Sequence, residues 1–306
     1  MAFNVEFLVT GASGFLGEVV TRELARRGER VVGLYRHHPI EIAGATLLSC
    51  DLSDLDQTRL LCRELRPRVV IHAAAQTNVG DAEKNPQEAR RDIVQATAVL
   101  TKCLAEESPA TTVVAVSTDQ VYDGQPRAGD EAYRIEDPPK PLSVYGRLKL
   151  EAETHVAKLP LHSIVRTALI YGPRGTHRGS FLEWLAEGLV RGDRRELFID
   201  EIRTPIFVED LARALISLGK MKSCGYWLAG GLDRLSRYQM GLLVADRLGV
   251  DSSLVVPTRL SETLTPAPRP ADLTLDSDSL WQEVGIERIG FEEGLDRSLA
   301  RRREPR

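Results

Sequence analysis

Tyr145 and Lys149 lie four positions apart in the stretch VYGRLKLEAE, at positions 144 to 153. Residues at this spacing share one face of a helix. A tyrosine donates a proton readily only if its pKa falls well below the usual ~10, and a nearby lysine ammonium favours the phenolate form. The pattern predicts an acid–base pair. The alternative is a half-buried tyrosine beside a solvated lysine.

Thr118 is the second candidate for chemistry, because it ends the nearly continuous apolar run TTVVAVST. Such a run is typical of a strand buried on both faces, and its carboxyl end lies at the sheet edge where ligands bind. A hydroxyl there can donate a hydrogen bond to a substrate oxygen as charge develops on it. We therefore predict that Thr118, Tyr145 and Lys149 form one carbonyl-reducing site.

The segment VTGASGFLGEVVTREL places Gly11, Gly14 and Gly17 between a predicted strand and a predicted helix. Glycines here permit a tight turn and a close approach of the backbone to a pyrophosphate, which the helix N-terminus also attracts. A purely structural turn is the alternative. The predicted cofactor-binding residues are Gly11, Ser13, Gly14, Phe15, Leu16, Gly17, Arg36, Asp51, Leu52, Ala73, Ala74, Ala75, Tyr145 and Lys149.

The second predicted strand ends in GLYRHH, without the carboxylate that would bind the ribose 2′-hydroxyl of NAD. Arg36, helped by His37 or His38, could instead pair with a 2′-phosphate, so NADP(H) is predicted over NAD(H). The alternative is a solvated basic turn. The small residues 73–75 allow a backbone to lie along the cofactor, although tight helix–sheet packing would select the same side chains.

Through residue 172 the sequence alternates short apolar runs with helical stretches, which predicts an α/β fold with a doubly wound parallel sheet. We expect an NADP-binding Rossmann domain at 1–172, with return segments near 204–229 that include a strand in RTPIFV. A smaller substrate-binding lobe is expected from 173–203 and 230–306. Segments of the two parts are expected to interleave.

The composition excludes several classes of protein. The chain has 306 residues, a net charge of −4, and no apolar run near the roughly 20 residues of a membrane span. We therefore expect neither a nucleic-acid partner nor a membrane, and a cytoplasmic location. Cysteines 50, 62, 103 and 224 lack the spacing of zinc ligands, so no metal site is predicted and they are interpreted as small buried residues.

The chain resembles the extended branch of the short-chain dehydrogenase/reductase family, and within it the rhamnose-forming nucleotide-sugar reductases. The shared motifs are VTGASGFLG, RPRVVIHAAAQTNV, STDQVYDG, EDPPKPLSVYGRLKLEAE and VRTALIYG. The likeness is close over residues 5 to 172 and looser to about residue 285. It implies that Thr118, Tyr145 and Lys149 are the catalytic residues of an NADPH-dependent reductase acting on a nucleotide-linked 4-keto-6-deoxy sugar.

The resemblance also implies roles for three further residues. Asp51 would bond the adenine amino group, although it could equally be the N-cap of the next helix. Arg203 and Arg269 would bind the nucleotide diphosphate. The alternative for either arginine is a surface ion pair.

Two other functions stay open. One is a nucleotide-sugar epimerase or dehydratase that retains NAD, because Asp119 directly follows Thr118. The other is a non-catalytic, NADP-binding regulatory subunit of the same fold. A homodimer is one possible assembly, and the oligomeric state stays open.

Overall fold

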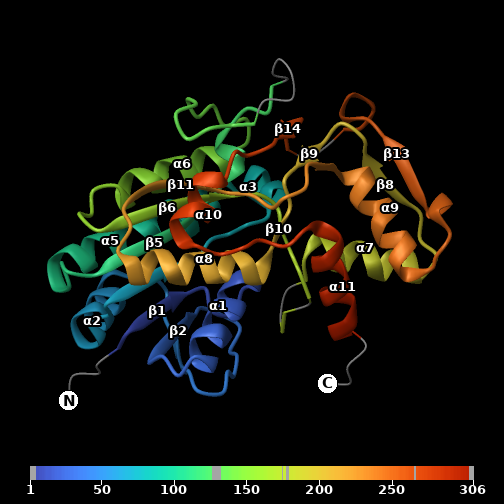
Figure 1. The fold of residues 1–306 in the computed structure, drawn as a ribbon. Coiled ribbons are helices and arrows are strands. Elements are labelled where there is room, and N and C mark those ends of the chain that lie inside the picture. Colours follow the sequence, from blue (N-terminus) through green and yellow to red (C-terminus); the bar gives the residue numbers. More distant parts are fainter. Residues whose placement is uncertain (1–4, 126–131, 174, 177–178, 265–266, 303–306) are drawn as a thin grey trace.

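The computed structural model describes residues 5–125, 132–173, 175–176, 179–264 and 267–302. Its centre is a seven-stranded parallel sheet in the order β11-β6-β5-β4-β1-β2-β3 (Figure 1). The strands are β1 (Phe7–Thr10), β2 (Val31–Tyr35), β3 (Thr46–Ser49), β4 (Val69–His72), β5 (Thr112–Thr118), β6 (His162–Thr167) and β11 (Gly225–Ala229). The predicted doubly wound α/β class is confirmed.

Helices cover both faces of this sheet, and the alternation of side chains along β1 shows why. Phe7 and Val9 point into a core shared with Leu211 of α8, whereas Leu8 points into the opposite core with Leu100 of α5. The first layer contains α1 (Phe15–Arg26), α8 (Val208–Met221) and α10 (Asp278–Val284). The second contains α2 (Leu55–Leu65), α5 (Ala96–Glu107) and α6 (Val144–Val156).

Local side-chain bonds fix where several helices begin. Ser143 caps α6 by accepting a hydrogen bond from the Gly146 amide, which places Tyr145 in the first turn. Asp54 caps α2 by accepting from the amides of Asp56 and Gln57. The N-cap alternative for Asp51 was therefore wrong, since the helix begins three residues later than that reading required.

One helical stretch between β4 and β5 is interrupted. It consists of α3 (Val79–Lys84), α4 (Pro86–Arg90) and a π-helical turn, η1 (Arg91–Gln95), which leads into α5. A π turn holds one extra residue per turn, and such turns often occur at functional sites. Here it carries Asp92, which is buried.

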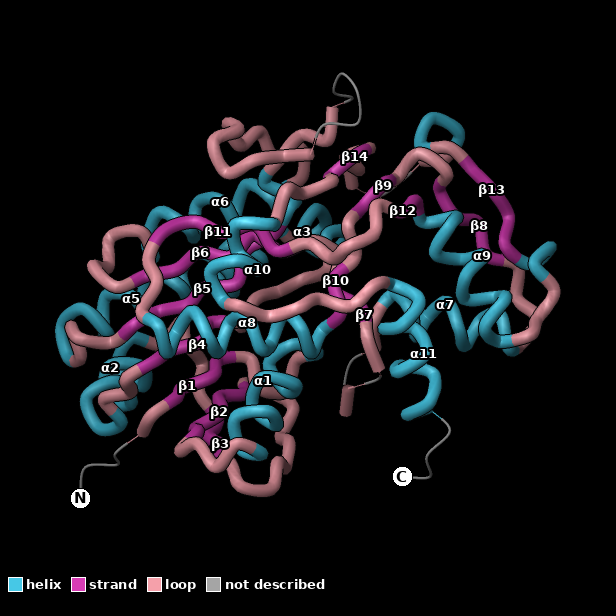
Figure 2. Tube along the Cα trace, in the orientation of Figure 1, coloured by secondary structure: helices cyan, strands magenta, loops and turns pink. Residues whose placement is uncertain are grey.

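The smaller lobe packs around its own apolar core, which includes Leu185, Met240, Val244 and Phe291. Its helices are α7 (Phe181–Val190), α9 (Arg237–Leu248) and α11 (Phe291–Arg302) (Figure 2). Parallel strands β8 (Arg195–Phe198) and β13 (Val255–Thr258) flank them.

The segment RTPIFV forms two short strands rather than the single return strand expected. β9 (Ile202–Arg203) pairs with β12 (Leu235–Ser236) and β14 (Asp272–Leu273), and β10 (Ile206–Phe207) pairs with β7 (Ile170–Tyr171). Pro205 lies between the two strands and has no amide to donate to a ladder. Neither strand belongs to the main sheet.

Two other expectations bear on the surface. Cys50, Cys62 and Cys103 are buried as predicted, but Cys224 is exposed because it lies in the short connection between α8 and β11. In the part of the chain that the structure describes, no helix combines the length and the apolar character needed to cross a membrane.

Candidate active site

The glycine turn lies against the carboxyl end of β4 with no room for side chains. A Cβ atom on Gly17 would be 2.1 Å from the carbonyl oxygen of Gly11, and one on Gly11 would be 2.9 Å from Ala74 Cα. Gly11 also has a φ of +71°, a conformation that favours glycine. The turn therefore packs tightly against Ala74, as a structural turn would. Its three glycines also line a cavity, where their backbone is not covered by side chains.

A cavity of about 600 Å³ runs from this turn along the carboxyl ends of β1, β2, β4, β5 and β6. Every cofactor-binding residue predicted from the sequence lines it, as do Thr118 and Arg203. Residues of the smaller lobe, including Phe181 and Arg237, close its other end. The cavity therefore joins a phosphate-sized turn at one end to polar groups of the second lobe at the other.

Tyr145, Lys149 and Thr118 are buried in the wall of this cavity, at 8%, 8% and 6% exposure. The Lys149 ammonium donates to the carbonyl oxygen of Val116 at 2.7 Å, which ties α6 to β5. The Thr118 hydroxyl donates to Asp119 Oδ1 at 3.2 Å. The two helical residues and the strand-end hydroxyl thus meet as the sequence predicted.

The acid–base properties of the pair differ from the expectation. Burial raises the pKa of Tyr145, and the negative charge of Asp119 adds to this, while a hydrogen bond with Thr118 acts in the opposite direction. Burial lowers the pKa of Lys149 to about 8, against the charge of Glu153. The expected lowering of the tyrosine pKa was wrong for these side chains alone, because burial and the charge of Asp119 together outweigh the hydrogen bond with Thr118.

Arg36 lies at the predicted ribose position, but its guanidinium is already paired. It forms a bidentate bond with Asp92 of η1, in which Nη2 and Oδ2 are 2.6 Å apart. Its neighbour Asp51 accepts from the Ser53 amide and hydroxyl and pairs with Arg91. Sequence reasoning missed Asp92, which is 56 positions from its partner.

The two arginines assigned to substrate binding differ in position. Arg203 is 4% exposed and donates to the carbonyl oxygens of Ile202, Pro270 and Ala271, with its Nε 3.9 Å from Asp119 Oδ2. Arg269 pairs with Glu201 at 3.0 Å and is not among the residues that line the cavity. Their phosphate-binding roles stay predictions.

Arg237, which the sequence did not single out, is the more available cation. It is the first residue of α9, its Nε donates to Glu201 at 3.0 Å, and its guanidinium lies 4.5 Å from the centre of the Phe181 ring. Among the described residues, neither its Nη1 nor Asp119 Oδ2 has a hydrogen-bond partner, although both atoms are buried. Unpaired buried polar atoms in a cavity wall indicate a polar ligand.

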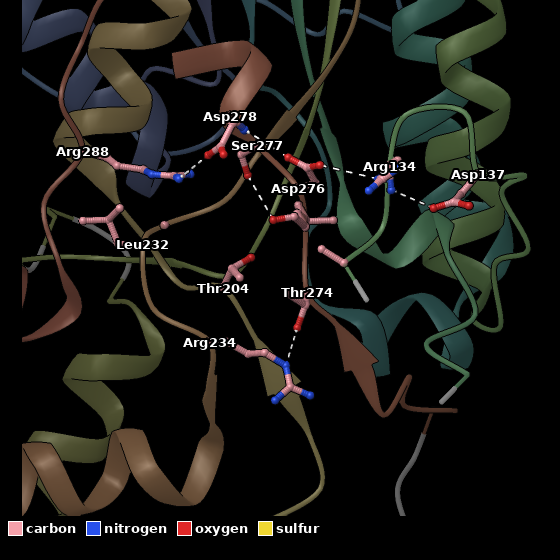
Figure 3. A pocket seen from close by; sticks show the side chains of 13 residues that line it. Arg134, Asp137, Thr204, Leu232, Arg234, Thr274, Asp276, Ser277, Asp278 and Arg288 are labelled. Carbon is pink, nitrogen blue, oxygen red and sulfur yellow. Dashed lines mark hydrogen bonds and ion pairs between the residues drawn. The ribbon is translucent and has the colours of Figure 1, made fainter. Parts of the chain in front are cut away.

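A second cavity, of about 480 Å³, has Thr204, the residue after Arg203, in its wall (Figure 3). Three arginines line it, and each is held by an acidic or hydroxyl partner: Arg134 by Asp276, Arg288 by Asp278, and Arg234 by Thr274 and Asp272. None of the predicted catalytic or cofactor residues reaches it. Its balanced charges select no particular ligand.

Comparison with known proteins now places the chain in a family. The chain belongs to the family described as the RmlD substrate binding domain, which matches residues 5–304. This confirms the extended short-chain dehydrogenase/reductase-like fold that the motifs indicated.

Individual relatives span nearly the whole chain. A probable low-salt glycan biosynthesis reductase, Agl14, of Haloferax volcanii is 31% identical over 94% of this chain and 95% of its own. A dTDP-4-dehydrorhamnose reductase of Streptomyces griseus is 31% identical over 92% and 88%. The structure of the dTDP-4-dehydrorhamnose reductase of Bacillus anthracis in complex with NADP superimposes with a TM-score of 0.84 at 23% identity, covering 98% and 100% of the two chains.

Proposed function

We propose that this protein is an NADPH-dependent reductase of a nucleotide-linked 4-keto-6-deoxy sugar. The observation that carries the proposal is the meeting of Thr118, Tyr145 and Lys149 in one cavity with the glycine turn. Membership of the RmlD family and the reductase names of its relatives support the same substrate class.

The residues fit a nicotinamide dinucleotide. Gly11, Gly14 and Gly17 line the cavity with backbone that no side chain covers, next to the N-terminus of α1. A reduced nicotinamide, when bound, supplies a hydride to the keto carbon. Arg36 would recognise the 2′-phosphate that distinguishes NADP(H) from NAD(H), so we propose the phosphorylated cofactor.

Each catalytic side chain then has one task. Thr118 donates a hydrogen bond to the keto oxygen as negative charge develops there. Tyr145 gives its phenolic proton to that oxygen, which completes the alcohol. The Lys149 ammonium stabilises the resulting phenolate, and that requires it to be protonated. Arg237 offers its unpaired Nη1 to the anionic end of the substrate.

The proposal is tested by Tyr145→Phe, with Tyr226→Phe on β11 as the matched control. Removing the phenolic proton should lower turnover of a dTDP-linked 4-keto-6-deoxy sugar by at least about 100-fold, because general acid catalysis contributes ~10²- to 10⁴-fold. NADPH affinity, measured by fluorescence titration, should stay close to that of the unchanged protein. Full activity in Tyr145→Phe would refute the assignment.

One observation favours a second function within the same fold. Asp119 follows Thr118, is 4% exposed and lines the cavity. Its Oδ2 accepts no hydrogen bond and lies 3.9 Å from Arg203 Nε, while burial, opposed by Arg203, raises the pKa of Asp119 to about 6. A carboxyl group of this kind could serve a NAD-retaining epimerase or dehydratase. The cofactor released from the purified, denatured protein distinguishes the two functions. Stoichiometric NAD would support this alternative, whereas protein without cofactor, or with NADP, would support the reductase.

Absence of turnover on keto sugars together with a stoichiometric protein partner would instead support a regulatory subunit.

A further inference from the structure

A buried ion pair lies one helical turn beyond the catalytic lysine. Glu153 follows Lys149 by four positions on α6 and is 4% exposed, and Arg166 of β6 is 5% exposed. The guanidinium holds both carboxylate oxygens, with Nη2 to Oε2 at 2.8 Å and Nε to Oε1 at 3.1 Å. Tyr145, Lys149 and Glu153 therefore occupy three successive turns of one helix face.

This ion pair is connected to the strand that carries the catalytic hydroxyl. Ser117 of β5 donates to Glu153 Oε1 at 2.5 Å, while Lys149 donates to the carbonyl oxygen of Val116, the preceding residue. Arg166 also donates to the Tyr122 hydroxyl at 2.9 Å. Two consecutive turns of α6 are thus bonded to two consecutive residues of β5, immediately before Thr118.

Stability alone does not account for this arrangement. Removing two charges from water is costly, and an apolar pair of similar volume is often as stable as a buried ion pair or more so. The position next to Lys149 indicates a different use. Lys149 is buried, and burial disfavours its charged form, so a fixed negative charge one turn away opposes that effect.

The other ionisable groups around Lys149 do not supply this charge. His72 of β4 is buried, and burial together with the charge of Lys149 lowers its pKa to about 3, so it is neutral. Tyr145 is a neutral phenol, and the charge of Asp119 raises the pKa of that phenol. Among these neighbours Glu153 is the one whose charge raises the pKa of Lys149.

We propose that Glu153, clamped by Arg166, is a positioning residue of the reductase that sets the register of α6 on β5 and keeps Lys149 in its ammonium form. The proposal rests on the proposed function, since it concerns how the catalytic lysine is prepared. It assigns a role to a residue that does not line the cavity.

The first variant is Glu153→Gln, which keeps the shape and an acceptor for Ser117 but removes the charge. Glu151→Gln, on the exposed side of the same helix, is the matched control, and Glu153→Asp restores the charge. The basic limb of the kcat/KM profile should move to lower pH by about one unit in Glu153→Gln, return in Glu153→Asp, and not move in Glu151→Gln. A purely structural role would lower activity at all pH values alike.

A double variant and a chemical-labelling measurement keep the test valid if the single variant does not fold or the protein shows no turnover. If Glu153→Gln fails to fold with Arg166 left unpaired, the double variant Glu153→Gln/Arg166→Met removes both charges. A downward shift smaller than that of the single variant is then expected, because the loss of the Arg166 positive charge acts in the opposite direction. The pH midpoint for acetylation of Lys149 by acetic anhydride, followed by mass spectrometry, reports its protonation without turnover. It should fall by about one unit as well.

The outcomes separate this proposal from the proposed function. An unchanged acetylation midpoint and pH profile in the folded charge-removed variants would overturn the role of Glu153. A shifted midpoint in a protein that reduces no keto sugar would support the role of Glu153 while refuting the reductase function.

Discussion

The most discriminating prediction concerns Arg36 and the choice of cofactor. Arg36→Ala removes the guanidinium predicted to pair with a 2′-phosphate, and it leaves the carboxylate of Asp92, 8% exposed, without its partner. NADPH binding should therefore weaken strongly. NADH, which lacks the phosphate, should lose little.

The magnitude follows from the geometry. A hydrogen bond to a charged group contributes ~1.5–3 kcal/mol, which corresponds to about 10- to 150-fold in affinity. The unpaired Asp92 carboxylate adds repulsion, so we expect the upper part of this range for NADPH and less than about threefold for NADH. Asp92→Asn should act in the opposite direction: Arg36 is released from a bidentate partner, and NADPH should bind more tightly.

Fluorescence titration of the reduced cofactors against the unchanged protein, both single variants and the double variant measures all of these effects. Because added salt screens exposed charges, the difference between NADPH and NADH should narrow at high ionic strength. Equal losses for NADPH and NADH in Arg36→Ala, or tighter binding of NADH than NADPH by the unchanged protein, would refute the assignment of Arg36.

Two more predictions concern the scaffold. Gly17→Ala should lower the free energy of unfolding by roughly 1–3 kcal/mol and weaken cofactor binding, because the new Cβ would lie 2.1 Å from the Gly11 carbonyl oxygen. Gly14→Ala places its Cβ 3.1 Å from the same oxygen, so its loss of stability in urea denaturation should be smaller. Burial alone would raise the pKa of Glu201, but the positive charges of Arg237, Arg203 and Arg269 lower it to about 2. The folded pKa is depressed, so this carboxylate stabilises the protein above its unfolded pKa of ~4.3, and roughly 3 kcal/mol should be lost as the pH falls towards 2. Glu201→Gln should remove that part of the acid dependence, and an unchanged acid profile would contradict the reasoning.

The sequence predicts well the sheet and the meeting of Thr118, Tyr145 and Lys149 in one cavity, because both depend on local signals. The runs at 69–71 and 113–116 are apolar throughout, as is typical of strands buried on both faces, and polar or small residues follow them directly. The spacing of Tyr145 and Lys149 is a property of the helix itself. These features need no knowledge of distant residues.

The features that the sequence did not reveal depend on long-range pairing. Arg36 meets Asp92 through a π turn that no periodicity predicts, and Arg237 approaches the cavity only because α9 is carried there by the smaller lobe. The strand in RTPIFV appears continuous in sequence, but Pro205 divides it between two sheets. The raised pKa of Tyr145 depends on burial, which motif spacing does not report.

The late position of α8 and β11 in the chain has a consequence for synthesis. The apolar side of β4 and β5 packs against α8, which begins 41 residues after β6 ends (208 − 167), and β11 completes the sheet edge only at residue 229. On the ribosome the first six strands of the main sheet therefore emerge with part of one apolar face exposed to water and one edge unpaired. A nascent chain of this kind is exposed to aggregation until the much later segments dock, so chaperone demand should be greatest before residue 208 has left the exit tunnel.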